Sequence, residues 1–298
     1  MGNERAGRAT VFIVFHHVMF SEQVHVKEAT SSKVSSMNID QSYVLITGAS
    51  AGIGTEFARQ YAAAGYNLVL TARRAAALEE LASTLRARFN VAVETIPADL
   101  LVEKDRALLV TRLQQTENPV EILVNNAGFG LGKSFDAAPV EEHLAQVDVL
   151  AKVPLQLMHT AITAMLPRGR GRIINLASVA AFTPGGTYSA VKRFLVSISE
   201  SANLQYGKHG ITVTAVCPGL TRSEFHSAMG QTEPSLPGFL WLTPQQVVTS
   251  AITAVNRGQA VCVPSLPYKL TVAAARLLPR RTVAAAISRT RDYQPLVL

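Results

Sequence analysis

The stretch that decides the fold is VLITGASAGIG, residues 44–54. Its first four residues, Val44–Thr47, are apolar or β-branched, which favours a buried β-strand. Three glycines follow, Gly48, Gly52 and Gly54, where the chain must turn and a helix is expected to begin. Backbone N–H groups at such a helix start can bind a phosphate. The G-x-x-x-G-x-G spacing differs from the more familiar G-x-G-x-x-G, so alone it fits either a nucleotide site or a tight turn.

The same strand-to-helix alternation continues along the chain. The predicted strands are 44–47, 67–72, 92–97, 122–125, 172–176, 212–217 and 260–263, and the predicted helices are 52–64, 76–88, 104–116, 140–166, 189–206 and 244–257. The strand segments are apolar on both sides of the pleat, and most are followed by a helix. This pattern predicts an α/β fold, a doubly wound parallel sheet of the Rossmann type, as a single domain over residues 41–265.

The composition excludes several classes of protein. Of the 298 residues, 48% are hydrophobic and 16% charged, which excludes disordered, collagen-like and disulfide-scaffold chains. The two cysteines, Cys217 and Cys262, lie in apolar segments, so we expect buried free thiols and a cytoplasmic protein. No histidine pairs with another His, a Cys or a carboxylate at ligand spacing, so we predict no metal site.

The net charge of +7 is concentrated at one end of the chain. Residues 1–40 sum to zero, residues 41–265 to +2 and residues 266–298 to +5. We expect residues 1–40 to be a disordered extension, since the apolar segment 11–20 is half the length of a membrane span of roughly twenty residues. We expect residues 266–298 to form a basic helical tail, packed on the domain or on another subunit, with contact to an anionic membrane as the less favoured alternative. The arginines lack interleaved aromatics, so nucleic-acid binding is not expected.

The residues after the second predicted strand bear on the choice of nucleotide. An enzyme that binds NAD places an acidic residue here for the ribose 2′-hydroxyl. This chain has Arg73 and Arg74 instead. Their guanidinium groups can hold a 2′-phosphate through paired, charge-assisted hydrogen bonds. The alternative is a pair of solvent-exposed arginines at a helix start. NADP(H) is therefore favoured over NAD as the cofactor.

Five motifs in one order carry a family resemblance. They are Gly48-x-x-x-Gly52-x-Gly54, Asn125-Asn126-Ala127-Gly128, Ser178, Tyr188-x-x-x-Lys192 and Pro218-Gly219. Over residues 42–263 the chain resembles the short-chain dehydrogenases/reductases, in particular NADP-preferring members of actinobacterial type. The resemblance implies an enzyme that interconverts an alcohol and a ketone or aldehyde. It also implies a homodimer or homotetramer packed through the long fourth and fifth helices.

The resemblance also implies a set of cofactor-binding residues. They are Gly48, Ser50, Gly52, Ile53, Gly54, Arg73, Arg74, Asp99, Leu100, Asn125, Ala127, Gly128, Tyr188, Lys192, Pro218, Gly219 and Thr221. Asp99 and Leu100 would touch the adenine, and Thr221 the nicotinamide carboxamide or the diphosphate. From the residues alone, Asp99 fits a helix N-cap equally well, and Asn125-Asn126 fits a turn.

Ser178, Tyr188 and Lys192 are the predicted catalytic residues. Tyr188 and Lys192 lie four positions apart on a predicted helix and so share a face. A neighbouring ammonium is expected to lower the phenol pKa from its usual value near 10. The phenol would then protonate a carbonyl oxygen as hydride reaches the carbon, and Ser178 would orient that oxygen. By the resemblance, Lys192 would also bind the nicotinamide ribose. The alternatives are a surface Tyr–Lys pair and a serine that caps a turn.

Two departures from the family pattern bear on the site, and the first of them, at position 150, leaves a different function open. Leu150 occupies the position where many members have an asparagine that props a kinked helix and leads a water to the lysine. Ser178 and Tyr188 are only ten positions apart, closer than is usual. The alternative to an enzyme is thus a non-catalytic NADP-binding sensor or scaffold on the same fold.

The segment between Gly219 and Pro244 is a candidate substrate lid because prolines and glycines recur in it. Its apolar residues are predicted to line a groove for a small, mostly apolar substrate: Phe225, Met229, Leu236, Phe239, Leu240 and Trp241. Packing within the lid itself is the alternative.

Overall fold

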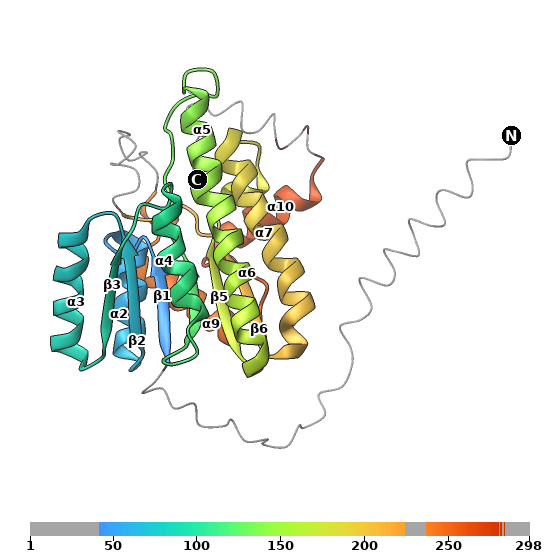
Figure 1. Ribbon diagram of the computed structural model, residues 1–298. Coiled ribbons are helices and arrows are strands. Elements are labelled where there is room, and N and C mark those ends of the chain that lie inside the picture. The colour runs from blue at the N-terminus through green and yellow to red at the C-terminus, as the bar shows by residue number, and fades with distance from the viewer. Residues whose placement is uncertain (1–41, 224–236, 280, 282, 284–298) are drawn as a thin grey trace, which may run out of the picture. The chain divides into compact units, whose positions relative to one another are not determined.

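The protein is described by a computed structural model that covers residues 42–223 and 237–279 together with Arg281 and Val283, all within one compact unit. Within these residues, seven parallel strands form one sheet in the order β3-β2-β1-β4-β5-β6-β7 (Figure 1). The predicted doubly wound fold is confirmed. The predicted extension 1–40 and most of the tail after Pro279 lie outside the described residues.

The strand order reverses between β1 and β4, and this position determines where ligands can bind. The strands are β1 (Tyr43–Thr47), β2 (Asn67–Ala72), β3 (Val93–Pro97), β4 (Val120–Asn125), β5 (Gly171–Leu176), β6 (Ile211–Val216) and β7 (Val261–Cys262). Val44 pairs with Leu68 of β2 on one side and with Ile122 of β4 on the other. Every residue of β1 and β4 is buried, as the apolar strand segments predict. Chain connections leave β1 and β4 toward opposite faces, which opens a crevice at their carboxyl ends.

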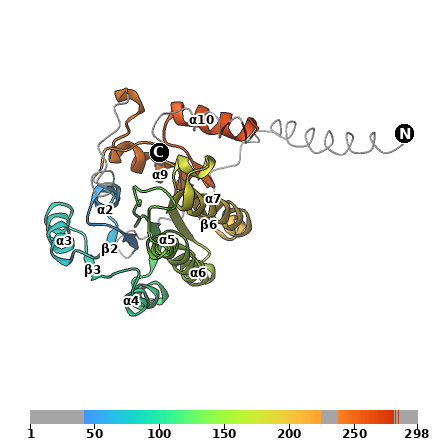
Figure 2. The same cartoon turned by 90° about the horizontal axis from the view of Figure 1, so that it is seen from above.

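Helices cover both faces of the sheet (Figure 2). One face carries α2 (Gly52–Ala63), α3 (Ala75–Phe89), α9 (Pro244–Asn256) and α10 (Leu266–Leu277). The other carries α4 (Glu103–Gln114), α5 (Val140–Val147), α6 (Val153–Met165) and α7 (Gly186–Tyr206). Short helical turns are η2 (Asp148–Lys152), η3 (Leu166–Arg168), η4 (Val179–Phe182), η5 (Gly207–His209) and η6 (Gly238–Leu240).

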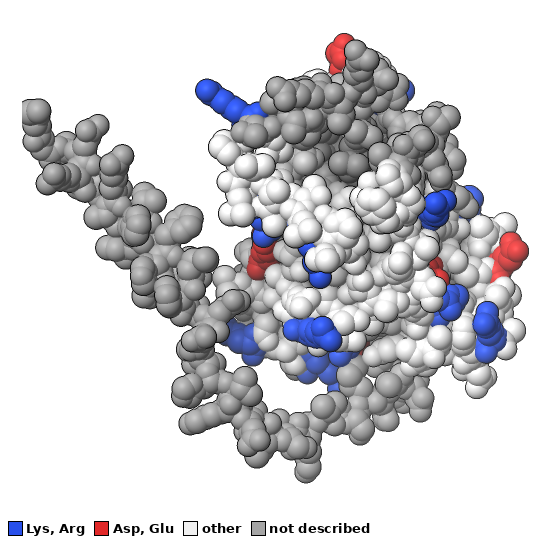
Figure 3. All heavy atoms as spheres, turned by 180° about the vertical axis from the view of Figure 1, so that it is seen from behind, with Lys and Arg blue, Asp and Glu red and all other residues white. Residues whose placement is uncertain are grey.

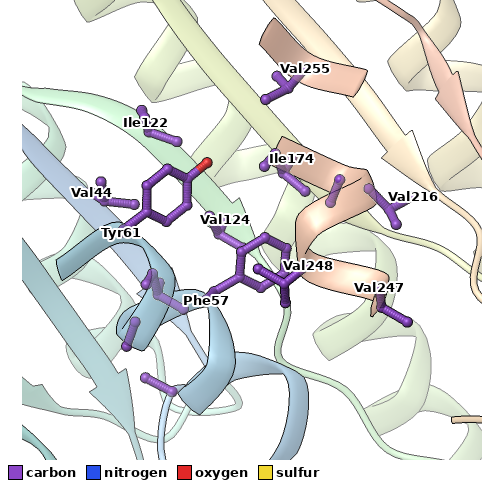
Figure 4. Close-up of a cluster of buried hydrophobic side chains, with 14 of the residues drawn as sticks. Val44, Phe57, Tyr61, Ile122, Val124, Ile174, Val216, Val247, Val248 and Val255 are labelled. Carbon is purple, nitrogen blue, oxygen red and sulfur yellow. The ribbon is translucent and has the colours of Figure 1, made fainter. Parts of the chain in front are cut away.

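The core on the α2 face holds aromatic side chains from α2 against branched residues of the sheet and of α9. Phe57 and Tyr61 lie over Val44 and Val124, and Val248 of α9 closes the cluster (Figure 4). Phe57 and Val248 are completely buried. Burying such side chains is the main favourable term in folding, so this cluster holds α2, and the turn before it, on the sheet.

The helix predicted over residues 140–166 is interrupted by a π-helical turn. In η2 the N–H of Val153 donates to the carbonyl of Asp148, five residues earlier. The π-helical turn arises because Pro154, the residue after Val153, has no N–H to donate to the carbonyl of Leu150. The stretch Val140–Arg168 is long and apolar enough to cross a membrane. Its buried residues, Leu157 among them, form the core on the second face of the sheet, so it is a core helix here.

The helix α10 is part of the folded unit. Tyr268 and Val272 are buried in the same core as Phe57. The folded unit therefore extends beyond residue 265, where we predicted its end, to at least Leu277. Of the predicted tail, the part that forms α10 packs on the domain.

We predict that Phe57→Ala lowers the free energy of unfolding by about 3–5 kcal/mol, because a fully buried ring would leave a cavity. Urea unfolding followed by circular dichroism measures this change. Leu204→Ala, at a side chain that is 86% exposed, is the matched control and should change stability by less than about 0.5 kcal/mol. Equal effects of the two substitutions would contradict the assigned core.

Candidate active site

A cavity of about 510 Å³ opens at the carboxyl ends of the strands, at the predicted crevice. Loops that follow β1, β2, β3, β4, β5 and β6 all contribute to its wall. The lining residues are Gly48, Ser50, Ala51, Gly52, Ile53, Thr71, Ala72, Arg73, Arg74, Ala98, Asp99, Leu100, Leu101, Asn126, Ala127, Gly128, Phe129, Gly130, Val149, Leu176, Ala177, Ser178, Tyr188, Lys192, Pro218, Gly219, Leu220, Thr221 and Ser223. Most of the predicted site residues thus meet in one place.

The glycine turn after β1 lies directly against the end of β4. Gly48 has φ +66°, and a Cβ on it would lie 2.8 Å from Cα of Ala127, so no other residue fits without a shift. The backbone N–H groups of Asn126 and Ala127 both donate to Oγ1 of Thr47, at 3.0 Å. The Asn126 side chain donates to the carbonyl of Thr47 at 2.9 Å. These bonds hold the start of α2 at the cavity, where its free N–H groups can bind an anion.

Two predicted cofactor residues, Gly54 and Asn125, do not line the cavity. A Cβ on Gly54 would meet the carbonyl oxygen of Gly48, so this glycine lets α2 pack on the turn. The Asn125 amide donates to Oδ1 of Asn175 at 2.9 Å, and Asn175 donates to Ser199 of α7 at 2.8 Å. Asn125 therefore ties β4 to β5 and α7, while its neighbour Asn126 reaches the cavity. The Asn-Asn pair did not indicate which of the two would do so.

The two arginines after β2 lie exposed at the edge of the cavity. Arg74 donates from Nη2 to the carbonyl of Ser50 at 2.9 Å, which joins the end of β2 to the glycine turn. Asp99 also lines the cavity, and its carboxylate accepts from the N–H of Leu101 at 2.9 Å. The N-cap of α4 is Val102, so Asp99 is not the helix cap considered as its alternative role.

Ser178, Tyr188 and Lys192 converge on the same wall of the cavity. Ser178 follows β5, and its hydroxyl both caps η4, accepting from the N–H of Ala180 at 3.1 Å, and hydrogen bonds Tyr188. Lys192 lies 5.5 Å from the centre of the Tyr188 ring, measured from Nζ. The ten-residue spacing between Ser178 and Tyr188 is therefore compatible with contact between them.

Burial shifts the pKa values of both residues on α7. It raises the pKa of the Tyr188 phenol, and the hydrogen bond with Ser178 opposes that rise. Burial lowers the pKa of the Lys192 ammonium to about 8. We expected the pKa of the phenol to lie below its usual value, but the net shift is upward, because loss of hydration is the largest effect on Tyr188. At neutral pH the phenol keeps its proton.

Leu150 and Lys192 both lie next to Gly128. Leu150 is fully buried, and a Cβ on Gly128 would lie 2.7 Å from its Cδ2, so the leucine packs directly on that glycine. The Lys192 ammonium donates to the carbonyl of Leu176 at 2.6 Å. In the family pattern an asparagine at this position props a kinked helix. Here the helix is also irregular, although the position holds Leu150, because Pro154 causes the π-helical turn.

A polar contact that we did not predict holds the start of α7. This end has no side-chain cap, since Gly185 is the N-cap and Gly186 is the first helical residue. Nδ1 of His143, on α5, lies 2.8 Å from Oγ1 of Thr187, next to the tyrosine. Nε2 of the same ring lies 3.0 Å from the carbonyl oxygen of Phe135. We could not predict this contact, because no sequence pattern links a histidine on one helix to a threonine on another.

The residues predicted to line a substrate groove do not reach the cavity where they are described. Phe239 is 72% exposed, and Trp241 is buried beneath Arg222, whose guanidinium carbon lies 5.5 Å from the ring centre. Neither these two nor Leu240 lines the cavity. Phe225, Met229 and Leu236 lie outside the described residues. Phe129, Val149 and Leu220 supply apolar wall instead.

With this geometry in view, comparison with known proteins identifies the class. The family model described as short chain dehydrogenase matches residues 42–234. The chain belongs to the short-chain dehydrogenase family of oxidoreductases.

Relatives and solved structures of the family agree with this assignment. An uncharacterized oxidoreductase of Staphylococcus saprophyticus is 32% identical over 62% of this chain and 80% of its own length. A short-chain dehydrogenase from Sphingobium yanoikuyae in complex with NADPH is 30% identical, with a TM-score of 0.72 over 84% of this chain and 98% of its own. The bulky-bulky ketone specific alcohol dehydrogenase from Comamonas testosteroni is also 30% identical, with a TM-score of 0.69 over 86% and 98%.

We predict that Gly128→Ala costs about 1–3 kcal/mol of stability, because the new methyl group would clash with Leu150. The cost should shrink when Leu150→Ala makes room for it. A double-mutant cycle by urea unfolding should therefore give a coupling energy of about 0.5–3 kcal/mol. Purely additive effects would show that the two side chains do not meet.

Proposed function

We propose that this chain is an NADP(H)-dependent oxidoreductase that interconverts an alcohol with a ketone or aldehyde. The observation that carries the proposal is that Ser178, Tyr188 and Lys192 share one cavity with the glycine turn and the two arginines. Nucleotide binding and proton transfer would then take place at the same crevice. The neighbours that support it are the NADPH complex and the ketone-specific dehydrogenase described above.

The residues present fit an NADP molecule. Gly48 and Gly52 leave the cavity free of side chains where α2 begins, so N–H groups there would bind the diphosphate. Arg73 and Arg74 would hold the 2′-phosphate, since no acidic residue stands at the end of β2. Asp99 and Leu100 would lie at the adenine end and Thr221 near the other end. When bound, the nicotinamide supplies or accepts the hydride.

The proton is handled by residues of α7 and β5. Tyr188, whose raised pKa keeps it protonated, donates its hydroxyl proton to the carbonyl oxygen of the substrate as that oxygen gains charge. Ser178 donates a second hydrogen bond to the same oxygen and so orients it. The Lys192 ammonium stabilises the phenolate left behind, and its bond to the Leu176 carbonyl holds it there without the asparagine. A phenol that holds its proton at neutral pH can serve as the acid in the reductive direction.

The substrate we propose is small and mostly apolar. Phe129, Val149 and Leu220 present apolar surface to the cavity. The long helix presents a row of exposed apolar side chains, Val140, Leu144, Val147 and Leu155, on its outer face. This row supports assembly into a homodimer or homotetramer through the long fourth and fifth helices. We place the protein in the cytoplasm, where the buried thiols Cys217 and Cys262 stay reduced.

Tyr188→Phe tests the proposal. Removal of the phenolic hydroxyl should lower kcat for carbonyl reduction by about 10²- to 10⁴-fold and leave NADPH affinity unchanged. The assay follows NADPH oxidation with a panel of ketones and aldehydes. Tyr206→Phe, at the other end of the same helix, is the control and should keep full activity. A wild-type protein that binds NADPH yet reduces no carbonyl would instead be the sensor or scaffold.

Arg73→Ala and Arg74→Ala test the cofactor preference. Loss of one charge-assisted hydrogen bond costs about 1.5–3 kcal/mol, so each should raise the KM for NADPH about tenfold or more. The KM for NADH should not rise, because NADH has no 2′-phosphate. Arg88→Ala, further along α3, is the control. An equal loss for both nucleotides would mean that these arginines do not read the phosphate.

The pH profile tests Lys192. Its ammonium is charged below a pKa of about 8 and neutral above it, so kcat/KM for carbonyl reduction should fall as pH rises through about 8. The fall should disappear in Lys192→Arg, whether or not the variant is slower, because guanidinium stays charged. A wild-type profile that remains level through pH 8 would contradict the role of this residue.

A further inference from the structure

The outward side of α10 is an apolar surface that no described residue covers. Leu266, Leu270 and Leu277 are 67%, 64% and 84% exposed, and their spacing puts them on one side of the helix. The opposite side carries Tyr268 and Val272, which are buried in the core. We call this outward set the α10 outer face: Leu266, Leu270, Ala273, Ala274 and Leu277. Most exposed helices of soluble proteins have one apolar side, whereas α10 has two.

The stretch of sequence that contains α10 carries charge of one sign. From residue 234 to residue 291 the sequence has no Asp or Glu but seven basic residues: Arg257, Lys269, Arg276, Arg280, Arg281, Arg289 and Arg291. Lys269 and Arg276, seven positions apart, lie along one flank of α10. Figure 3 views the molecule from the side that carries α10, where basic side chains, with some acidic ones, are scattered over a largely uncharged surface. An apolar strip with a basic flank complements a surface that is both apolar and anionic.

A second copy of the chain matches this face less well. Two outer faces in contact would bring Lys269 of one copy near the same basic flank of the other, and α10 has no acidic residue to offset it. Arg276 finds its partner elsewhere, 3.6 Å from Glu200 of α7. Like charges in an interface oppose association, whereas lipid phosphates would neutralise them.

The same helix is attached to the wall of the cavity. The Tyr268 hydroxyl accepts from the N–H of Leu220 at 3.1 Å and donates to the carbonyl of Leu240 at 3.0 Å. Its ring lies against Gly219, where a Cβ would overlap it. Leu220 and Gly219 both line the cavity. A surface bound to α10 would therefore lie one layer of side chains from the site.

We propose that the α10 outer face docks on an anionic lipid surface. Its leucines enter the boundary between headgroups and acyl chains, and the exposed side chains of Lys269 and Arg281 contact lipid phosphates. Docking of this kind is reversible and leaves the fold unchanged, since Tyr268 and Val272 stay in the core. One side of α10 then packs on the domain, and the opposite side contacts the membrane. The proposal does not depend on the chemistry of the site.

Vesicle flotation of the full chain tests the proposal. Vesicles of phosphatidylcholine alone are compared with vesicles of equal parts phosphatidylcholine and phosphatidylglycerol. The chain should float with the anionic vesicles only, and high salt should release it. Replacing Leu266, Leu270 and Leu277 together by Gln should reduce binding at least about tenfold. Leu204→Gln, at a leucine of α7 that is 86% exposed, is the matched control and should bind like the unchanged chain.

Three results would overturn the proposal. The chain does not float with anionic vesicles, or the triple variant floats as well as the unchanged chain, or the triple variant has a smaller oligomeric mass by analytical ultracentrifugation. The last result would assign the face to a contact between copies. Equal urea midpoints for the triple variant and the Leu204→Gln control exclude loss of folding as the cause of weaker binding. The fold-change in binding is then due to the face itself.

Discussion

The backbone of Gly48 touches that of Ala127, and the rest of the site depends on this contact. A side chain at Gly48 would separate the turn after β1 from the end of β4. The bonds from Asn126 and Ala127 to Thr47 close the gap further. Because the turn is held here, α2 begins with its N–H groups at the crevice and its Phe57 in the core. Binding geometry and core packing thus follow from one close approach between parallel strands.

A second constraint acts on the proposed chemistry, because α7 holds a half-buried phenol beside a buried ammonium. Burial acts on the two in opposite directions, raising one pKa and lowering the other. The ammonium is kept in place by the Leu176 carbonyl and the phenol by Ser178, both from the end of β5. The end of β5 therefore holds both the phenol and the ammonium in place. The result is an acid that holds its proton at neutral pH beside a cation able to stabilise its anion.

The fold was predictable because each element is encoded locally. Strand segments apolar on both sides, such as Val44–Thr47, can only be buried, and glycines mark the turns. That Ser178, Tyr188 and Lys192 would meet in one cavity was predictable from motifs that fall within one or two elements. What could not be predicted depends on contacts between distant segments. The sequence does not show that Asn126 rather than Asn125 faces the cavity, that His143 reaches Thr187, or that α10 returns to the core. Nor does a leucine at position 150 reveal that Pro154 bends the helix.

Transfer of a labelled hydride tests the central claim most directly. The protein is incubated with NADPH that carries deuterium in both positions at nicotinamide C4 and with a panel of bulky apolar ketones and smaller aldehydes. Mass spectrometry and NMR then locate the label in any alcohol formed. We expect one deuterium on the carbinol carbon, with the hydroxyl proton drawn from solvent. Tight binding of NADPH without deuterated alcohol from any member of the panel would contradict the claim and leave a nucleotide-binding scaffold.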